Sequence, residues 1–218
     1  MIARQRRAPF TNAMVGLNVV AFVWLALTGG WNNLNSLLAH GALYGPAVLA
    51  GQWWRIITGA FLHGGIPHIA LNMIALYQVG RLVEMLLGSL RTAILYFIAM
   101  IGSGIAVVIF APTEVTVGAS GAIFGLFGAL VAIGLRLGSP GRSLVMQTVP
   151  IIAINLAFGF LVPNISNAGH LGGLICGFAA GLAVAYSIRL RRAPIAQPAD
   201  GLSGDPRPSE PPAVGPPA

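Results

Sequence analysis

The sequence is short of charge, and above all of negative charge. Only 8% of its 218 residues are charged, five are Asp or Glu, and the twelve basic residues are all arginine because no lysine occurs. An ordinary soluble domain has about 25% charged residues. Here 56% of the residues are hydrophobic and the mean hydropathy is +0.81. This composition excludes an ordinary soluble domain and predicts an integral membrane protein.

Cysteine is almost missing as well. The single Cys176 excludes an intramolecular disulfide and any metal site of the CxxC type, and its apolar neighbours suggest an unreactive helix residue. The net charge of +7 would indicate nucleic acid as a partner of a soluble protein, but most arginines here flank apolar segments. We therefore predict a lipid bilayer, and no nucleic acid, as the surroundings of this chain.

Six stretches are long and apolar enough to cross a bilayer, which takes about 20 residues of helix. They cover residues 10–28, 68–87, 92–111, 119–137, 144–162 and 170–189. The first follows a basic segment but has no convincing small-x-small cleavage site, so we expect it to remain as a span.

The arginines predict the orientation of these spans. With both termini in the cytoplasm, the arginines that flank the spans lie inside and only Arg55 lies outside, as the positive-inside rule requires. Segments 29–67, 112–118 and 163–169 are then external. The first of these is too long for a hairpin and carries aromatic rings suited to the headgroup layer, so we expect short interfacial helices there.

The predicted fold is an all-α integral membrane protein, a bundle of six transmembrane helices with a long, partly helical first external loop. Residues 1–9 form a basic cytoplasmic N-terminus and residues 10–192 the six-span domain. Residues 193–218 contain eight prolines among 26 residues and few large apolar side chains. We predict a disordered, solvated cytoplasmic tail there.

A run of small residues, Gly118-Ala119-Ser120-Gly121, opens the fourth span. Such runs in apolar segments commonly form contact surfaces between membrane helices. Ser120 is also placed as a nucleophile at a helix start. The second, fourth and sixth spans run in the same direction, so their first residues share one face of the membrane. His68 and Asn72, Ser120, and His170 therefore converge near the external side, where polar groups are costly and tend to be functional.

Glycines sharpen this prediction. In the sixth span they recur every four residues, at 169, 173, 177 and 181, and Gly121 and Gly125 do the same in the fourth. The two spans can thus approach backbone to backbone. The glycines of each span form a stripe along one face of the helix. Measured around the helix axis, Ser120 lies about −100° from the stripe of the fourth span and His170 about +100° from the stripe of the sixth. Both side chains are therefore turned toward the same side of the contact between the two helices.

These residue types suit acyl transfer. A serine hydroxyl needs a base, and a neutral imidazole is well poised for that role near neutral pH. We predict Ser120 as nucleophile and His170 as general base. The Ser120 backbone N–H at the helix start, together with His68 and Asn72 on one helix face, would donate to the oxyanion.

A third triad member is missing from the pattern. Of the five acids only Glu114 falls on the predicted catalytic side, in a short loop. We therefore predict a Ser–His dyad whose imidazole is held by packing. His63, His68 and His170 as joint metal ligands are an alternative, without an acid to support them. We predict no cofactor and no metal.

The sequence resembles the rhomboid intramembrane serine proteases over about residues 51–186. The similarity is carried by Trp54-Arg55, by His63 followed by His68-x-x-x-Asn72, by Gly118-Ala119-Ser120-Gly121, and by Ala168-Gly169-His170 with Gly173 after it. The resemblance implies a six-helix bundle in which Ser120 attacks a peptide bond, His170 is the base, and His68 and Asn72 help bind the oxyanion. It also implies single-span membrane proteins as substrates, cut in or near their transmembrane segment, and a water-filled site open to the external face.

Two features depart from or qualify this resemblance. Phe124 stands where many family members have tyrosine, so a ring can pack on His170 without a phenol hydroxyl. The fifth span contains Pro150 and Gly159, which loosen a helix, and we hypothesise that it gates the site.

Two other functions stay open: an inactive family member that binds membrane clients, and a small transporter or metal carrier. We expect the cell membrane, plasma or inner, as the location. The oligomeric state does not follow from the sequence.

Overall fold

Helices make up almost all of the structure. The computed structural model describes residues 7–162 and 165–187, and six of the helices in these ranges are long and apolar enough to cross a membrane. They are α1 (Pro9–Thr28), α5 (Ile66–Leu87), α6 (Ser89–Phe110), α7 (Ser120–Leu137), α8 (Arg142–Leu161) and α9 (Asn167–Ser187). The predicted six-span, all-helical fold is confirmed. The predictions for residues 1–6 and for the tail 193–218 fall outside the described residues.

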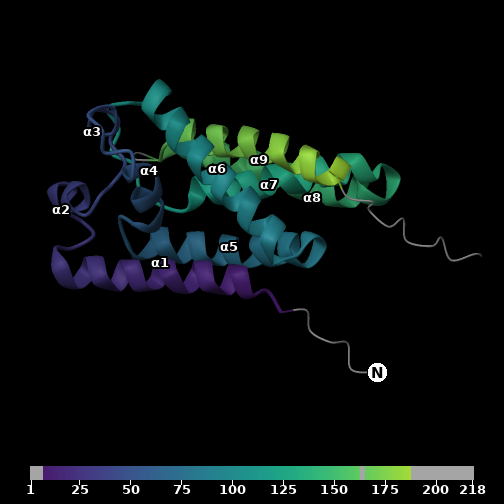
Figure 1. Cartoon of the computed structure of the whole chain (residues 1–218), viewed down its shortest axis with the longest axis horizontal. Helices are drawn as coiled ribbons and strands as arrows, with labels where there is room; N and C mark the ends of the chain where they lie inside the picture. Colours follow the sequence, from purple (N-terminus) through teal and green to yellow (C-terminus); the bar gives the residue numbers. More distant parts are fainter. Residues whose placement is uncertain (1–6, 163–164, 188–218) are drawn as a thin grey trace, which may run out of the picture.

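Proline and glycine set several helix boundaries. Pro9 and Pro67 occupy the first turns of α1 and α5, where a missing N–H costs nothing. Gly88 joins α5 directly to α6 and has φ 83°, a left-handed conformation that favours glycine. The tight turn at Gly88 places α5 and α6 antiparallel. Figure 1 shows that α5, α7 and α9 all begin at the same end of the bundle.

The first loop contains the expected short helices, which gather at that same end of the bundle in Figure 1. They are α2 (Leu34–Ala39), α3 (Gly45–Leu49), α4 (Arg55–Thr58) and the 3₁₀ turn η1 (Gly59–Phe61). Arg55 holds this loop together, because its Nη1 donates to the carbonyls of Leu38 at 2.8 Å and Ala42 at 2.9 Å. The loop is therefore a packed platform next to the start of α7.

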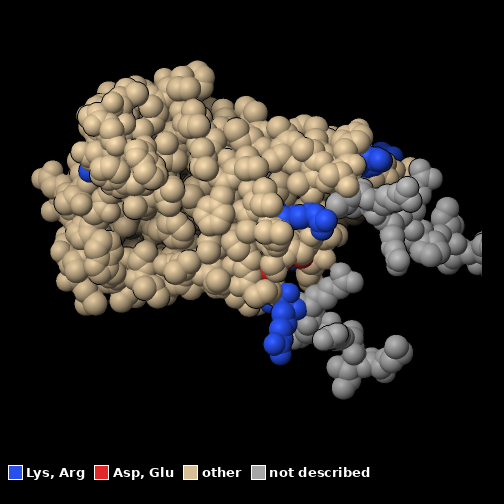
Figure 2. Space-filling view, viewed as in Figure 1, with Lys and Arg blue, Asp and Glu red and all other residues tan. Residues whose placement is uncertain are grey.

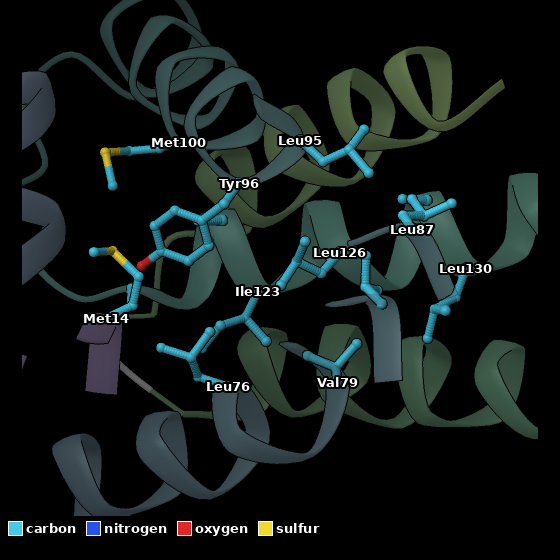
Figure 3. Packing of buried hydrophobic residues seen from close by; sticks show 14 of the residues in the cluster. Met14, Leu76, Val79, Leu87, Leu95, Tyr96, Met100, Ile123, Leu126 and Leu130 are labelled. Atoms are coloured by element: carbon cyan, nitrogen blue, oxygen red, sulfur yellow. The ribbon is translucent and has the colours of Figure 1, made fainter. Parts of the chain in front are cut away.

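The main core lies where α1, α5, α6 and α7 meet, and α7 has the most buried residues of the six spans. Figure 3 shows Tyr96 of α6 reaching toward Met14 of α1, and Leu76 and Val79 of α5 facing the α7 side chains. In contrast, α8 buries only Thr148, Ile152 and Gly159. Pro150 lies inside α8, where it cannot donate to the carbonyl one turn earlier.

One buried carboxylate fastens α1 to the bundle. Glu84 near the end of α5 is 4% exposed. Its Oε2 accepts from the Thr11 N–H at 2.8 Å and the Thr11 hydroxyl at 2.7 Å, and its Oε1 accepts from the Phe10 N–H at 3.0 Å and the Ser89 hydroxyl at 2.6 Å. Glu84 thus satisfies free N–H groups at the start of α1 and links three helices.

Candidate active site

Ser120 begins α7, and the loop before it is fixed from both sides. Thr116 and Leu43 exchange backbone hydrogen bonds of 2.9 and 3.0 Å, and the Gly118 N–H donates to the Gly59 carbonyl at 2.9 Å. Gly118 has φ 113° and turns the chain into the helix. The first-loop platform therefore determines where the Ser120 hydroxyl lies.

His170, in the first turn of α9, meets this hydroxyl. The His170 Nε2 and Ser120 Oγ atoms are 2.9 Å apart and hydrogen-bonded, although the two residues are 50 positions apart in the chain. The imidazole is 8% exposed, and the Phe124 ring stacks on it with centroids 4.2 Å apart and planes at 15°. The sequence expectation that these two side chains point to one side of the helix contact agrees with this geometry.

The glycine stripes are what brings the two helices so close. A Cβ atom added to Gly173 would overlap the Gly121 carbonyl oxygen, and one added to Gly177 would overlap the Gly125 carbonyl. At Gly181 the added atom would lie 2.6 Å from the Ala129 Cα. The α7–α9 contact is therefore backbone against backbone along its whole length.

A third helix, α6, takes part in this contact, and the sequence reasoning missed it. A Cβ at Gly121 would overlap the Ser103 side chain, and one at Gly169 would lie 3.1 Å from Ser103 Oγ. A cavity borders the same place, lined among others by Met100, Ser103 and Thr116. The signal was available as Gly102-Ser103-Gly104 in the third span.

His68 and Asn72 lie on one face of α5 beside the serine loop. A Cβ at Gly118 would lie 2.7 Å from His68 Nε2, so the imidazole packs against the loop that carries Ser120. His68 Nδ1 accepts the Gly64 N–H at 3.4 Å, and Asn72 Nδ2 donates to the His68 carbonyl at 2.9 Å. Among the described residues, Asn72 has no direct hydrogen bond to Ser120 or His170.

No carboxylate reaches His170 within residues 7–162 and 165–187, and its Nδ1 is buried without a hydrogen-bond partner. In the same ranges no three His, Cys, Asp or Glu side chains are grouped so that they could hold a metal ion. His63, His68 and His170 thus do not form the metal site weighed as an alternative. The grouping that the structure provides is a hydroxyl, an imidazole and neighbouring N–H donors.

His63, to which the sequence assigned no role in the chemistry apart from the metal alternative, lies next to the site. Its ring is fully buried and contacts His68 edge to face, with centroids 5.0 Å apart. Burial, and next the charge of neighbouring His68, lower the pKa of His63 to about 3.

Comparisons with known proteins identify the family of this chain. The family model described as "Rhomboid domain" matches residues 50–187. Rhomboid protease GluP of Bacillus subtilis (strain 168) is 42% identical over 180 residues, which are 80% of this chain and 34% of that protein. RHOMBOID-like protein 4 of Arabidopsis thaliana is 35% identical over 150 residues, 67% of this chain and 38% of its own length. Rhomboid-like protease 3 of Toxoplasma gondii is 29% identical over 151 residues, covering 67% and 57%.

This chain therefore spans between about a third and three fifths of the length of these relatives. The match to the family model nevertheless covers the elements from α4 to α9, which carry His68, Asn72, Ser120 and His170. The chain belongs to the rhomboid family.

Proposed function

We propose that this protein is an intramembrane serine endopeptidase that cleaves single-span membrane proteins in or near their transmembrane segment. The observation that carries the proposal is the hydrogen bond between Ser120 and His170 in a family some of whose similar members are named proteases. Rhomboid membership alone is weaker support, because other relatives carry only the name rhomboid-like.

In the proposed acylation step, Ser120 Oγ attacks the carbonyl carbon of the scissile peptide bond. Its proton passes to Nε2 of neutral His170, which is hydrogen-bonded to it. The C–O bond forms, the carbonyl becomes an oxyanion, and His170 then donates the proton to the leaving amine as the C–N bond breaks. In the second step a water attacks the acyl carbon and gives a proton to His170. The ester bond between the acyl carbon and Ser120 Oγ then breaks, the carboxyl product leaves, and His170 returns the proton to Ser120 Oγ.

The oxyanion would be stabilised by donors that are already in place. The gain from such donors arises because they are fixed before charge develops. The Ser120 N–H lies at the start of α7, where the helix dipole favours negative charge. Because His68 Nδ1 accepts the Gly64 N–H, the neutral ring carries its proton on Nε2, the atom beside Gly118. Asn72 keeps one amide hydrogen beyond the one it gives to the His68 carbonyl.

The arginines support a cytoplasmic location of both termini and an external opening of the site. Figure 2 shows arginine side chains gathered at the end of the molecule where α5 and α7 finish, and Arg55 lies in the first-loop helix α4 at the other end. By the positive-inside rule the Ser120 end then faces outward, in the plasma or inner membrane.

Purified protein incubated with a fluorescent single-span substrate in liposomes tests this function. We expect cleavage that is lost in Ser120→Ala and in His170→Ala, and a fluorophosphonate probe that labels wild type but not Ser120→Ala. Ser143→Ala and His40→Ala are matched controls, because Ser143 bonds to Gln147 at the start of α8 and His40 to first-loop groups. Cleavage that survives either site substitution refutes the dyad. A folded wild type with neither cleavage nor labelling indicates a client-binding protein instead.

A further inference from the structure

We propose that His63 is a positioning residue that holds His68 in the orientation needed for its Nε2–H to reach the oxyanion. This inference rests on the proposed protease function. It concerns a residue that has no place in the chemistry described above.

The ring of His63 lies beside His68, on the oxyanion side of the site. The ring is 0% exposed and packs on the His68 ring at an interplanar angle of 66°. A Cβ at Gly118 would lie 3.9 Å from His63 Cδ2 and 2.7 Å from His68 Nε2. His63 therefore fills the space beside both His68 and the loop that precedes Ser120, and it limits the directions in which the His68 ring can turn.

The backbone after His63 completes the restraint. Gly64, the next residue, donates its N–H to His68 Nδ1 at 3.4 Å. The same two-residue segment thus packs against the His68 ring and fixes which of its nitrogens accepts a hydrogen bond. A shift of His63 would also move the Gly64 N–H away from His68 Nδ1. The His68 ring would then lose its preference for carrying the proton on Nε2.

The choice of an imidazole, rather than a phenyl ring, needs a reason at this position. His63 Nε2 is buried without a hydrogen-bond partner among the described residues, which costs free energy that phenylalanine would avoid. What the imidazole adds is its Nδ1–H, which donates to the Phe61 carbonyl at 3.3 Å and fixes the plane of the ring. The cost is therefore offset by an orientation that a phenyl ring could not keep.

His63 also has to stay uncharged to do this. Burial and the charge of the adjacent His68 lower its pKa to about 3, so the ring remains neutral throughout the physiological range. A neutral ring can pack edge to face on His68 without repelling a proton on it.

The test uses two complementary substitutions in the full-length protein in liposomes. His63→Phe keeps a ring and loses the donor to Phe61, whereas His63→Asn keeps a donor and loses the ring. Because the oxyanion charge develops in the transition state and is absent from the bound substrate, each substitution should lower kcat by roughly 10-fold and leave KM unchanged. In a His68→Ala background neither should lower kcat further, because His63 acts through His68.

His40→Phe is the matched control, since His40 is a first-loop histidine that bonds to the Ser36 carbonyl at 2.7 Å and packs on Trp24. It should leave kcat unchanged. Thermal unfolding identifies which variants are folded, and one folded His63 variant is enough for the comparison. A folded variant with wild-type kcat, or losses that multiply in the double mutant, would overturn the inference. A wild type that cleaves nothing overturns the proposed function itself, a result distinct from either.

Discussion

Replacing Gly173 with alanine should push α9 away from α7 at the level of the catalytic pair. The added Cβ would overlap the Gly121 carbonyl oxygen and lie 3.2 Å from the Gly121 Cα. Both obstructing atoms belong to backbone, so no side chain can rotate out of the way. Since Gly121 follows Ser120 directly and Gly173 lies one turn after His170, the displacement acts on the Ser120–His170 contact.

The size of the effect follows from these distances. Carbon and oxygen atoms pack at about 3.5 Å or more, so the helices must separate by on the order of 1 Å. That moves the Ser120–His170 pair from 2.9 Å to the limit of hydrogen bonding or past it. A misplacement of about 1 Å costs on the order of 100-fold in rate. Overpacking a helix contact lowers the free energy of unfolding by about 1–3 kcal/mol.

The assay is a series of glycine-to-alanine substitutions, with kcat measured on a single-span substrate and stability by thermal unfolding. Gly177→Ala and Gly181→Ala meet backbone in the same way but lie further from the catalytic pair. They should lose similar stability and less activity than Gly173→Ala. Gly16→Ala in α1 is the control, because nothing lies within 4 Å of its added Cβ. Wild-type kcat and stability in Gly173→Ala, or an equal loss of activity in Gly181→Ala, would refute the reasoning.

Substitutions at three further positions give distinct readouts. Glu84→Gln should lower the free energy of unfolding by about 1–3 kcal/mol, because it weakens the buried cap on the start of α1. It should change kcat little, because this cap lies at the end of the bundle remote from the site. Thermal unfolding and the turnover assay measure the two effects. Asn72→Ala should reduce kcat by about 10- to 1,000-fold at constant KM, and an unchanged kcat would remove it from the oxyanion site. Phe124→Leu should reduce kcat by roughly 10-fold by freeing the imidazole, while Phe124→Tyr, which keeps the stacked ring, should retain turnover.

The spans and the helix contact could be predicted because both leave periodic signals. High hydropathy over about 20 residues predicts a membrane-spanning helix, and glycine at every fourth position predicts the face by which that helix contacts a neighbour. The small residues Gly102-Ser103-Gly104 are the signal for α6, but it is not periodic, because Gly102 and Gly104 are two residues apart and lie on different faces of the helix. Its place beside Gly121 depends on how three helices cross, which no single segment encodes.

Contacts made by loops, and contacts between segments distant in the sequence, could not be predicted for a different reason. The approach of His63 to His68 depends on the turn at Gly64 and Gly65, and loops have no period from which a side-chain direction follows. The Glu84 cap on Thr11 joins residues 73 positions apart and looks in the sequence like one acid among arginines. The direction of a side chain on a helix can be inferred from its glycine stripe, and its partner across the bundle follows only where the partner helix carries a matching stripe, as for Ser120 and His170.

The Glu84 site also gives a reason to propose a dyad rather than a triad. That carboxylate is buried only because two N–H groups and two hydroxyls donate to it, since an ionised group without such partners is costly inside a membrane protein. A carboxylate beside His170 Nδ1 would need similar donors, and neither α7 nor α9 contains an Asp or Glu. Stacking by Phe124 orients the imidazole without adding a charge. Among the described residues the imidazole is thus held by its hydrogen bond to Ser120 and by the stacked Phe124 ring, with its Nδ1 left without a hydrogen-bond partner.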